Sequence, residues 1–158
     1  MRSESFISKS AEKTKKIAEK LAREILKISF NQTEKPIAAI IVGLEGDLGG
    51  GKTTFVQGFA RGLGVKKNIT SPTFVILKRF RIKEARFKNL IHIDAYRVKN
   101  SGEILDLGWE GLANNPQNII LAEWADKIKD ILPKNHIQVR FKVVREDERE
   151  IIIISSFK

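Results

Sequence analysis

The sequence predicts an α/β fold in which helices cover both faces of a mostly parallel central sheet that also contains antiparallel strands. Three segments support this prediction. The run 37–44 is short, apolar and rich in β-branched residues, as in a strand buried on both faces. The next segment, 53–63, carries apolar side chains at helical spacing. Near the end of the chain, 136–144 alternates between apolar and polar residues, which predicts a half-buried strand.

Helices are predicted on either side of the first strand. Ser10 is a residue type that caps helices, and the segment from there to about Ile28 has an apolar stripe on one face. A loop is predicted over 31–36. After the strand, Gly62 and Gly64 are expected to stop the second helix.

The middle of the chain is predicted to return to strands. Two of them, 74–83 and 87–93, are expected to pair across a short turn. Ser101 is expected to cap a short helix that Gly108 ends. A further buried strand is predicted over 118–122 because this run is short and apolar.

The last third of the chain is predicted to close the sheet with a hairpin. A helix is expected over 124–132, where Pro133 stops it. The alternating strand 136–144 is followed by a charged turn over 145–149 and a last strand over 150–155. These two strands form the predicted C-terminal antiparallel hairpin.

The composition limits the class of protein. The whole chain, 1–158, is predicted to fold as one domain, since 158 residues is an ordinary domain size. Its formal net charge of +10 favours an anionic ligand or partner. The chain has no cysteine, which excludes disulfides and suits a reducing cytosol. No segment has the length of a membrane span or the apolar core of a signal peptide, so we expect a cytoplasmic protein without membrane contact.

One motif indicates what the chain binds. Residues 46–53 read Gly-Asp-Leu-Gly-Gly-Gly-Lys-Thr, which fits the phosphate-binding loop pattern of Gly, four unrestricted residues and Gly-Lys-Ser/Thr. The motif lies between a predicted strand and a predicted helix, as its chemistry requires. Its glycines permit backbone conformations that point several N–H groups at one phosphate. Lys52 is expected to reach the β and γ phosphates, and the Thr53 hydroxyl is expected to bind Mg²⁺.

Two carboxylates are candidates for work beside this loop. A protein that cleaves or transfers phosphate needs such a group, to hold Mg²⁺ or to orient the attacking water. Asp94 ends the apolar run 90–93, and Glu123 ends the apolar run 119–122. In an open parallel sheet, ligands gather at the carboxyl ends of the strands. We therefore predict that both carboxylates face the metal at this edge of the sheet.

Other residues leave two interpretations open. Thr73 precedes a predicted strand, where it would either contact Mg²⁺ or phosphate through its hydroxyl or simply begin the strand. Six basic residues crowd the predicted pair of strands, where they would either follow a nucleic-acid backbone or guard a sheet edge against strand addition. These residues are Lys78, Arg79, Arg81, Lys83, Arg86 and Lys88. His92 and His136 have no ligand partners nearby in the sequence and are predicted to be structural.

Together, these motifs resemble the bacterial ATPase family of tRNA threonylcarbamoyladenosine biosynthesis, the TsaE type, formerly called YjeE. The matching stretches are Gly46–Thr54, Ser71–Phe74, His92–Arg97, Glu103 with Gly108, and Ala122–Trp124. They occur in the order and at the spacing of the family. Gly50, Phe74 and Ala95 stand where the family commonly has Ala, Tyr and Leu, and none of these departures removes a group that the chemistry needs.

The resemblance implies a P-loop NTPase-like fold and a protein that binds and hydrolyses ATP with Mg²⁺. It also implies association with the two-protein threonylcarbamoyl transferase complex, of the TsaB and TsaD type, so that tRNA is contacted indirectly. By the same resemblance, Lys52, Asp94 and Glu123 act in catalysis, and Thr53 and Glu123 hold the metal. The implied nucleotide-binding residues are Gly46, Asp47, Leu48, Gly49, Gly50, Gly51, Lys52, Thr53, Thr54, Thr73 and Trp124.

Two other classes of function would use the same features. A small-molecule kinase would use the same loop, with Asp94 as the base that takes the acceptor's proton. Such kinases usually carry an arginine-rich lid, and 103–118 contains no arginine. An RNA-binding module with a nucleotide-controlled switch would rest on the basic strands alone. A GTPase is disfavoured because the chain has no Asn/Thr-Lys-x-Asp segment for reading guanine.

Overall fold

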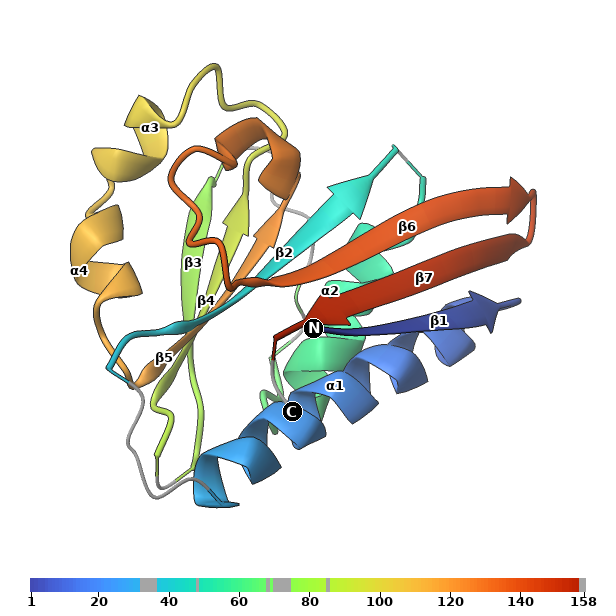
Figure 1. Cartoon of the computed structure of the whole chain (residues 1–158), viewed down its shortest axis with the longest axis horizontal. Helices are drawn as coiled ribbons and strands as arrows, with labels where there is room; N and C mark the ends of the chain where they lie inside the picture. The colour runs from blue at the N-terminus through green and yellow to red at the C-terminus, as the bar shows by residue number, and fades with distance from the viewer. Residues whose placement is uncertain (32–36, 48, 68, 70–74, 85, 157–158) are drawn as a thin grey trace.

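The computed structural model has the predicted α/β architecture, in which one mixed sheet separates two layers of helices (Figure 1). The structure describes residues 1–31, 37–47, 49–67, 69, 75–84 and 86–156. Most of the loop predicted over 31–36 therefore lies outside the described residues, as do Leu48 and Thr73. No helix of the described part is long and apolar enough to cross a membrane.

The helices and strands alternate along the chain as follows. In order they are β1 (Arg2–Ser8), α1 (Ala11–Asn31), β2 (Ile40–Gly46), α2 (Lys52–Gly62), β3 (Leu77–Arg81), β4 (Asn89–Asp94), α3 (Gly102–Leu105), α4 (Trp109–Ala113), β5 (Asn118–Glu123), the 3₁₀ helix η1 (Ala125–Ile128), β6 (Ile137–Arg145) and β7 (Glu148–Ser155).

The strands form one sheet in the order β1-β7-β6-β2-β5-β4-β3. Its centre is parallel, since β2 pairs in parallel with both β5 and β6, and β4 pairs in parallel with β5. The outer pairs are antiparallel: β3 with β4 at one edge, and β7 with β6 and β1 at the other. The sheet therefore confirms the parallel centre, the antiparallel strands and the C-terminal hairpin that the sequence predicts.

The register of the central strands brings three chain positions to one level. Glu123 of β5 is the register partner of Leu44 in β2 and of Asp94 in β4. The phosphate-loop motif begins at Gly46, two residues beyond Leu44. Strand pairing alone therefore places both predicted carboxylates at the edge of the sheet from which the loop leaves β2.

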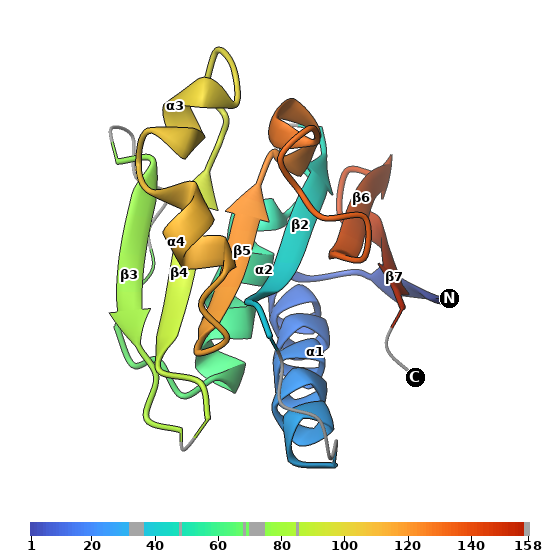
Figure 2. The ribbon, with the colours of Figure 1, turned by 60° about the vertical axis from the view of Figure 1, so that its left-hand side comes forward.

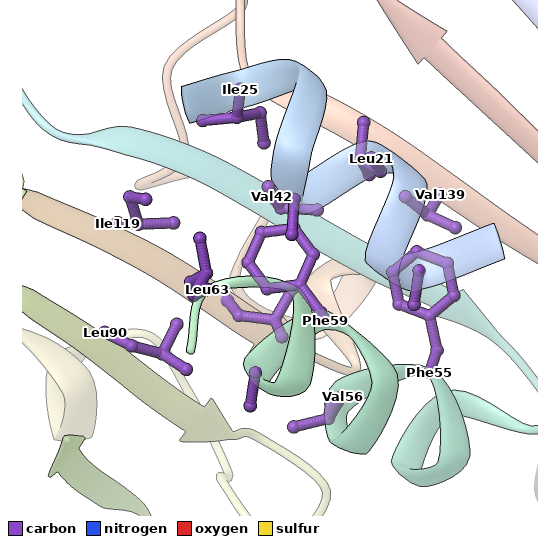
Figure 3. Packing of buried hydrophobic residues seen from close by; sticks show 14 of the residues in the cluster. Leu21, Ile25, Val42, Phe55, Val56, Phe59, Leu63, Leu90, Ile119 and Val139 are labelled. Atoms are coloured by element: carbon purple, nitrogen blue, oxygen red, sulfur yellow. The ribbon is translucent and has the colours of Figure 1, made fainter. Parts of the chain in front are cut away.

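The first helical layer, α1 and α2, covers one face of the sheet (Figure 2). Phe55 and Phe59 of α2 are fully buried between α1 and the strands, and the ring of Phe55 also meets Phe141 of β6 edge-on at 5.4 Å (Figure 3). The two helices lie so close that a Cβ at Gly58 of α2 would overlap backbone atoms of Lys15 in α1. This close approach fixes α2, and hence the loop at its N-terminus, against the sheet.

The second layer, made of α3, α4 and η1, covers the opposite face (Figure 2). Ile104, Trp109 and Ile128 contribute its buried side chains, and they belong to one cluster with Ile91 and Ile120 of the sheet. Because both faces are covered, the central strand β5 is buried along its whole length. This explains why its residues 119–122 are continuously apolar.

Two elements were not predicted. Strand β1 pairs antiparallel with β7, and its side chains are mostly polar because it forms one edge of the sheet. Helix α4 begins after Gly108, whose φ of 89° is left-handed, so this glycine separates two short helices where the prediction placed only an end. The N-terminal helix itself begins where predicted, since the Ser10 hydroxyl accepts a hydrogen bond from the Lys13 N–H at 3.0 Å.

Two local predictions were wrong. The helix expected over 124–132 is only the 3₁₀ turn η1, because Trp124 is left-handed and the 3₁₀ spacing buries both Ala125 and Ile128. Ser101 precedes α3 but makes no capping bond, since its hydroxyl donates to Asp130 instead. The second helix does end where predicted: Gly62 is its last residue, packed against α1, and Gly64 just beyond it is left-handed.

The packing of α1 against α2 predicts opposite effects for two helical glycines. Gly58→Ala adds a methyl group where the α1 backbone already lies, and such overpacking costs about 1–3 kcal/mol. Gly111→Ala in α4 meets no atom within 4 Å, so only the helix propensity gain of up to about 1 kcal/mol remains. Urea unfolding should therefore show that Gly58→Ala lowers the free energy of unfolding and that Gly111→Ala maintains or raises it. Equal stabilisation by both would contradict the close helix contact.

Candidate functional site

The loop that joins β2 to α2 has the backbone geometry of an anion-binding turn. Gly46 and Gly51 have φ angles of 149° and 97°, which side chains other than glycine rarely adopt. A Cβ at Gly46 would also lie 2.7 Å from the Phe141 carbonyl oxygen of β6, so this position has no room for one. The Gly50 N–H donates to the Asp47 carbonyl at 3.0 Å, which closes the turn. The N-terminus of α2 follows directly and adds its positive end to the loop.

Lys52, the first residue of α2, is buried within this loop. Its Nζ donates to the carbonyl oxygens of Gly46 at 2.5 Å and Asp47 at 2.7 Å. The same Nζ lies 4.0 Å from the centre of the Trp124 ring, which covers it as a cation–π partner. Burial lowers the pKa of Lys52, and the negative charge of Glu123 opposes that effect. The ammonium is thus held by the loop's own carbonyls, at the position from which it would reach a phosphate.

Three side chains from three elements form a hydrogen-bonded chain beside Lys52. The Thr53 hydroxyl of α2 donates to Glu123 Oε1 at 3.1 Å, and His92 Nε2 of β4 lies 2.7 Å from Glu123 Oε2. Glu123 and His92 are only 2% and 1% exposed. Each carboxylate oxygen of Glu123 therefore has its own partner, which fixes the orientation of the group. His92 Nδ1 has no hydrogen-bond partner among the residues that the structure describes.

Asp94 is the last residue of β4 and the register partner of Glu123 in β5. Its Oδ1 accepts a hydrogen bond from the Tyr96 N–H at 3.0 Å, which orients the carboxyl group. Burial raises the pKa of Asp94, and the nearby charge of Glu123 raises it further. A carboxylate whose pKa is raised in this way holds a proton more readily than a solvated one, as a base beside a phosphate would.

Trp124 combines backbone strain with contact to the loop lysine. It is the one residue other than glycine with positive φ in the described part of the chain, at 60°. This conformation turns the chain sharply after Glu123 and directs the indole over Lys52. The indole also packs against the Tyr96 ring at 5.0 Å, and Lys127 donates to the Tyr96 carbonyl. Strained residues of this kind occur preferentially at functional sites.

A groove of about 330 Å³ opens beside the loop. Gly49, Gly51 and Thr54 line it from the loop and α2, Thr14 lines it from α1, and the turn of the β6–β7 hairpin closes its far end. Arg149 of that hairpin also lines the groove and donates from its guanidinium to the Gly49 carbonyl at 3.1 and 3.2 Å. The ends of the chain therefore both contribute to this side of the loop.

The structure brings together most of the residues predicted from the sequence. Lys52, Thr53, Glu123 and Trp124 meet at the loop, and Asp94 ends the adjacent strand. Of the loop itself, Gly46, Asp47, Gly49, Gly50 and Gly51 are described, and Thr54 faces the groove. Leu48 and Thr73 lie outside the described residues.

Sequence reasoning missed three contributors to the site. His92 was predicted to be merely structural, but it contacts Glu123, and its position two residues before Asp94 on the same strand face was the available signal. Thr14 and Arg149 had no such signal. They reach the groove through the packing of α1 and the pairing of β6 with β2, which no local pattern encodes.

The chain is similar to several known proteins. A family model described as "Threonylcarbamoyl adenosine biosynthesis protein TsaE" matches residues 8–151. A Bacillus subtilis protein named tRNA threonylcarbamoyladenosine biosynthesis protein TsaE is 42% identical over 111 residues, which cover 70% of this chain and 66% of that protein. A protein of the same name from Rickettsia felis is 36% identical over 152 residues, or 96% of this chain and 80% of the relative.

A solved structure is also similar over nearly the whole chain. The crystal structure of YdiB from Bacillus subtilis superposes with a TM-score of 0.67 at 34% sequence identity, and the match covers 98% of this chain and 86% of YdiB. Both the sequence and the arrangement of the elements are therefore shared, and the chain belongs to the TsaE family.

Proposed function

We propose that this chain binds and hydrolyses ATP with Mg²⁺ in support of the enzyme complex that forms threonylcarbamoyladenosine in tRNA. The family supports the biological process, since the relatives are named for tRNA threonylcarbamoyladenosine biosynthesis. The observation that carries the chemistry is the contact between Thr53 and Glu123 at the mouth of a phosphate-binding loop. A plain connection between a strand and a helix needs neither group.

Phosphate binding is assigned to the loop backbone, the N-terminus of α2 and Lys52. The loop N–H groups and the helix end favour an anion, and the ammonium adds a full charge. Lys52 would exchange the carbonyl oxygens of Gly46 and Asp47 for phosphate oxygens. Since burial lowers the pKa of Lys52, an anionic phosphate beside it would raise that pKa and favour the ammonium form.

The donor set beside the loop fits a magnesium ion. Thr53 and Glu123 supply hard oxygen donors 3.1 Å apart, and Mg²⁺ prefers one or two protein oxygens together with phosphates and water. The described residues contain no cluster of three or more His, Asp or Glu that could hold a metal without such help. When bound, Mg²⁺ would neutralise charge on the phosphate oxygens. His92 would keep the second oxygen of Glu123 in place.

Asp94 is proposed to orient the attacking water and to take its proton. It ends the strand beside Glu123, its carboxyl group is fixed by the Tyr96 N–H, and its pKa is raised by burial. A base of this kind contributes about 10²–10⁴-fold to a rate. Trp124, which covers Lys52, would exclude bulk water from the phosphates.

The nucleoside is assigned to the groove on the other side of the loop. Its volume of about 330 Å³ lies in the range of small-molecule sites, and Gly49, Gly51 and Thr54 belong to both the loop and the groove. A nucleotide whose phosphates occupied the loop would extend its ribose and base toward Thr14 of α1 and the β6–β7 turn. Arg149, which already contacts Gly49, would stabilise that wall of the groove.

The partners are proposed from the family. The chain is expected to act with the two-protein threonylcarbamoyl transferase complex, of the TsaB and TsaD type, and to reach tRNA through it. We place this activity in the cytoplasm, because the absence of cysteine suits a reducing compartment. The single domain 1–158 would then serve as a nucleotide-driven accessory subunit.

Removing the loop ammonium should abolish turnover. We expect Lys52→Ala to lower phosphate release from ATP by at least about 100-fold, as loss of one charge-stabilising donor typically does. Release is measured with and without the purified partner complex. The control is Lys129→Ala, an exposed lysine after η1, which should match the wild type. Unchanged release in Lys52→Ala would contradict the proposal, and phosphorylation of an added metabolite would favour a kinase instead.

Asp94→Asn should raise the free energy of unfolding and lower the rate of phosphate release. The folded protein holds the Asp94 proton above the ordinary aspartate pKa of 3.8, so the wild type loses stability as pH rises past that value, and the neutral amide does not. Urea titrations from about pH 4 to 7.5 should show a stability gain that is largest at neutral pH and fades toward acid. Phosphate release should fall about 10²–10⁴-fold. The control is Asp106→Asn after α3, and a pH-independent stability difference would refute the assignment.

His92→Phe tests whether His92 positions the metal ligand. The ring keeps the packing volume but leaves one Glu123 oxygen without its partner, so the free energy of unfolding should fall by about 1–3 kcal/mol. The Mg²⁺ concentration needed for ATP binding should rise about 10–100-fold, measured by calorimetry. His136→Phe, the same change at a histidine that bonds Pro133, should leave that requirement unaltered. A folded His92→Phe variant with a normal Mg²⁺ requirement would assign His92 to packing alone.

A further inference from the structure

Most of the net charge of the chain lies in one stretch. Residues 61–88 contain nine Lys and Arg and one Glu, against a net charge of +10 for the whole chain. Within this stretch, six cationic residues follow β3 and its turn into β4, and we call them the basic edge. They are Lys78, Arg79, Arg81, Lys83, Arg86 and Lys88. Strand β3 is an outer strand of the sheet, remote in strand order from β1 at the opposite edge (Figure 1).

The charges of the basic edge are available to a ligand. None of the six forms an ion pair with any residue in the described part of the chain, and the one side-chain hydrogen bond described for them joins Lys88 to the Glu84 carbonyl. By contrast, Arg61 is bound by both Glu12 and Glu19. Like charges at this density repel one another, so an unpaired row of them favours an external anion.

Protection against strand addition does not account for this charge. Both edges of the sheet expose unpaired backbone groups and need the same protection. The opposite edge, β1, carries only Arg2 and Glu4, which pair with each other. The edge strand β1 thus has no net charge, whereas β3 and its turn carry six cations.

The chemistry of the basic edge matches a polyphosphate better than a protein. Protein interfaces are enriched in aromatic residues and depleted of lysine at their centres. Here the aromatic residues point inward, since Phe87 is fully buried and Phe80 packs against the hydrophobic cluster between the sheet and helices α1 and α2. None of the large apolar residues that the structure describes as exposed lies within 76–88. Without an exposed aromatic ring, the surface is better suited to contacts with phosphates than to stacking of bases.

We propose that the basic edge binds the phosphodiester backbone of RNA, with little preference for sequence. Arg79 and Arg81 lie on one face of β3, about 7 Å apart along the strand, and form a straight row that an extended backbone can follow. The inference rests on the proposed function only in naming tRNA as the RNA to test. It adds a direct contact to the route through the partner complex that the family implies.

The test measures binding of fluorescently labelled total tRNA by anisotropy, at several KCl concentrations. Arg79→Glu with Arg81→Glu should weaken binding at least about 10-fold and reduce the salt slope by about 1.5–2, since each lost phosphate contact removes about 0.7–0.9. The control is Lys129→Glu with Lys134→Glu, which changes the charge equally at two exposed lysines after η1 and should have less than about a 3-fold effect. Arg79→Gln with Arg81→Gln provides a milder version if the reversal impairs folding.

Three results would overturn the proposal. Wild-type protein that does not bind tRNA at about 100 mM salt would remove its basis. Equal weakening by the edge and control pairs would assign the effect to net charge. Loss of binding to the partner complex with unchanged tRNA binding would make the basic edge a protein interface. Phosphate release from ATP, measured on the same variants, reports separately on the nucleotide site, so the two proposals can fail independently.

Discussion

The site depends on keeping the carboxylate of Glu123 buried and charged. A carboxylate that is 2% exposed is costly unless each oxygen has a partner, and an unpaired one destabilises a fold by several kcal/mol. Thr53 satisfies one oxygen and His92 the other, while Lys52 provides the nearby positive charge. Thr53 lies on α2 and His92 on β4, while Glu123 itself lies on β5. The carboxylate therefore has both hydrogen bonds only when α2, β4 and β5 are all correctly placed. The same two hydrogen bonds fix the orientation of the carboxylate that we propose as a metal ligand.

The loop lysine, Lys52, already interacts with other groups of the protein. Lys52 already has two carbonyl partners and an aromatic cover, so a phosphate would replace existing interactions and would not simply add new ones. The net gain from binding is then smaller than the strength of a lysine–phosphate bond suggests. Burial raises the pKa of Asp94, and the like charge of nearby Glu123 raises it further. A cation held between phosphates and Glu123 would relieve that repulsion, so binding of metal and nucleotide would support each other.

The sequence predicted the parts of the site that depend on local patterns. The phosphate loop is contiguous, and Asp94 and Glu123 could be placed because each ends an apolar strand in a parallel sheet. Contacts between distant segments were not predictable: β1 pairs with β7 across almost the whole chain, and Arg149 reaches the loop because β6 of its hairpin pairs with β2. The prediction of a helix over 124–132 was wrong for another reason. Its apolar spacing is real, but the left-handed Trp124 and the contact with Lys52 override helix propensity.

The nucleotide site and the basic edge that we propose lie in the same sheet but have no residue in common. Strand β4 is hydrogen-bonded to β5, which carries Glu123, on one side and to β3, which carries the basic edge, on the other. Lys78 is the register partner of His92, so the basic edge and the site lie on neighbouring strands. Coupling between the two regions would require a second arrangement of β4, and its pairing with a strand on each side holds it in one. An anion on β3 would therefore leave the partners of Glu123 in place, and the two regions can bind ligands of the same charge while acting separately.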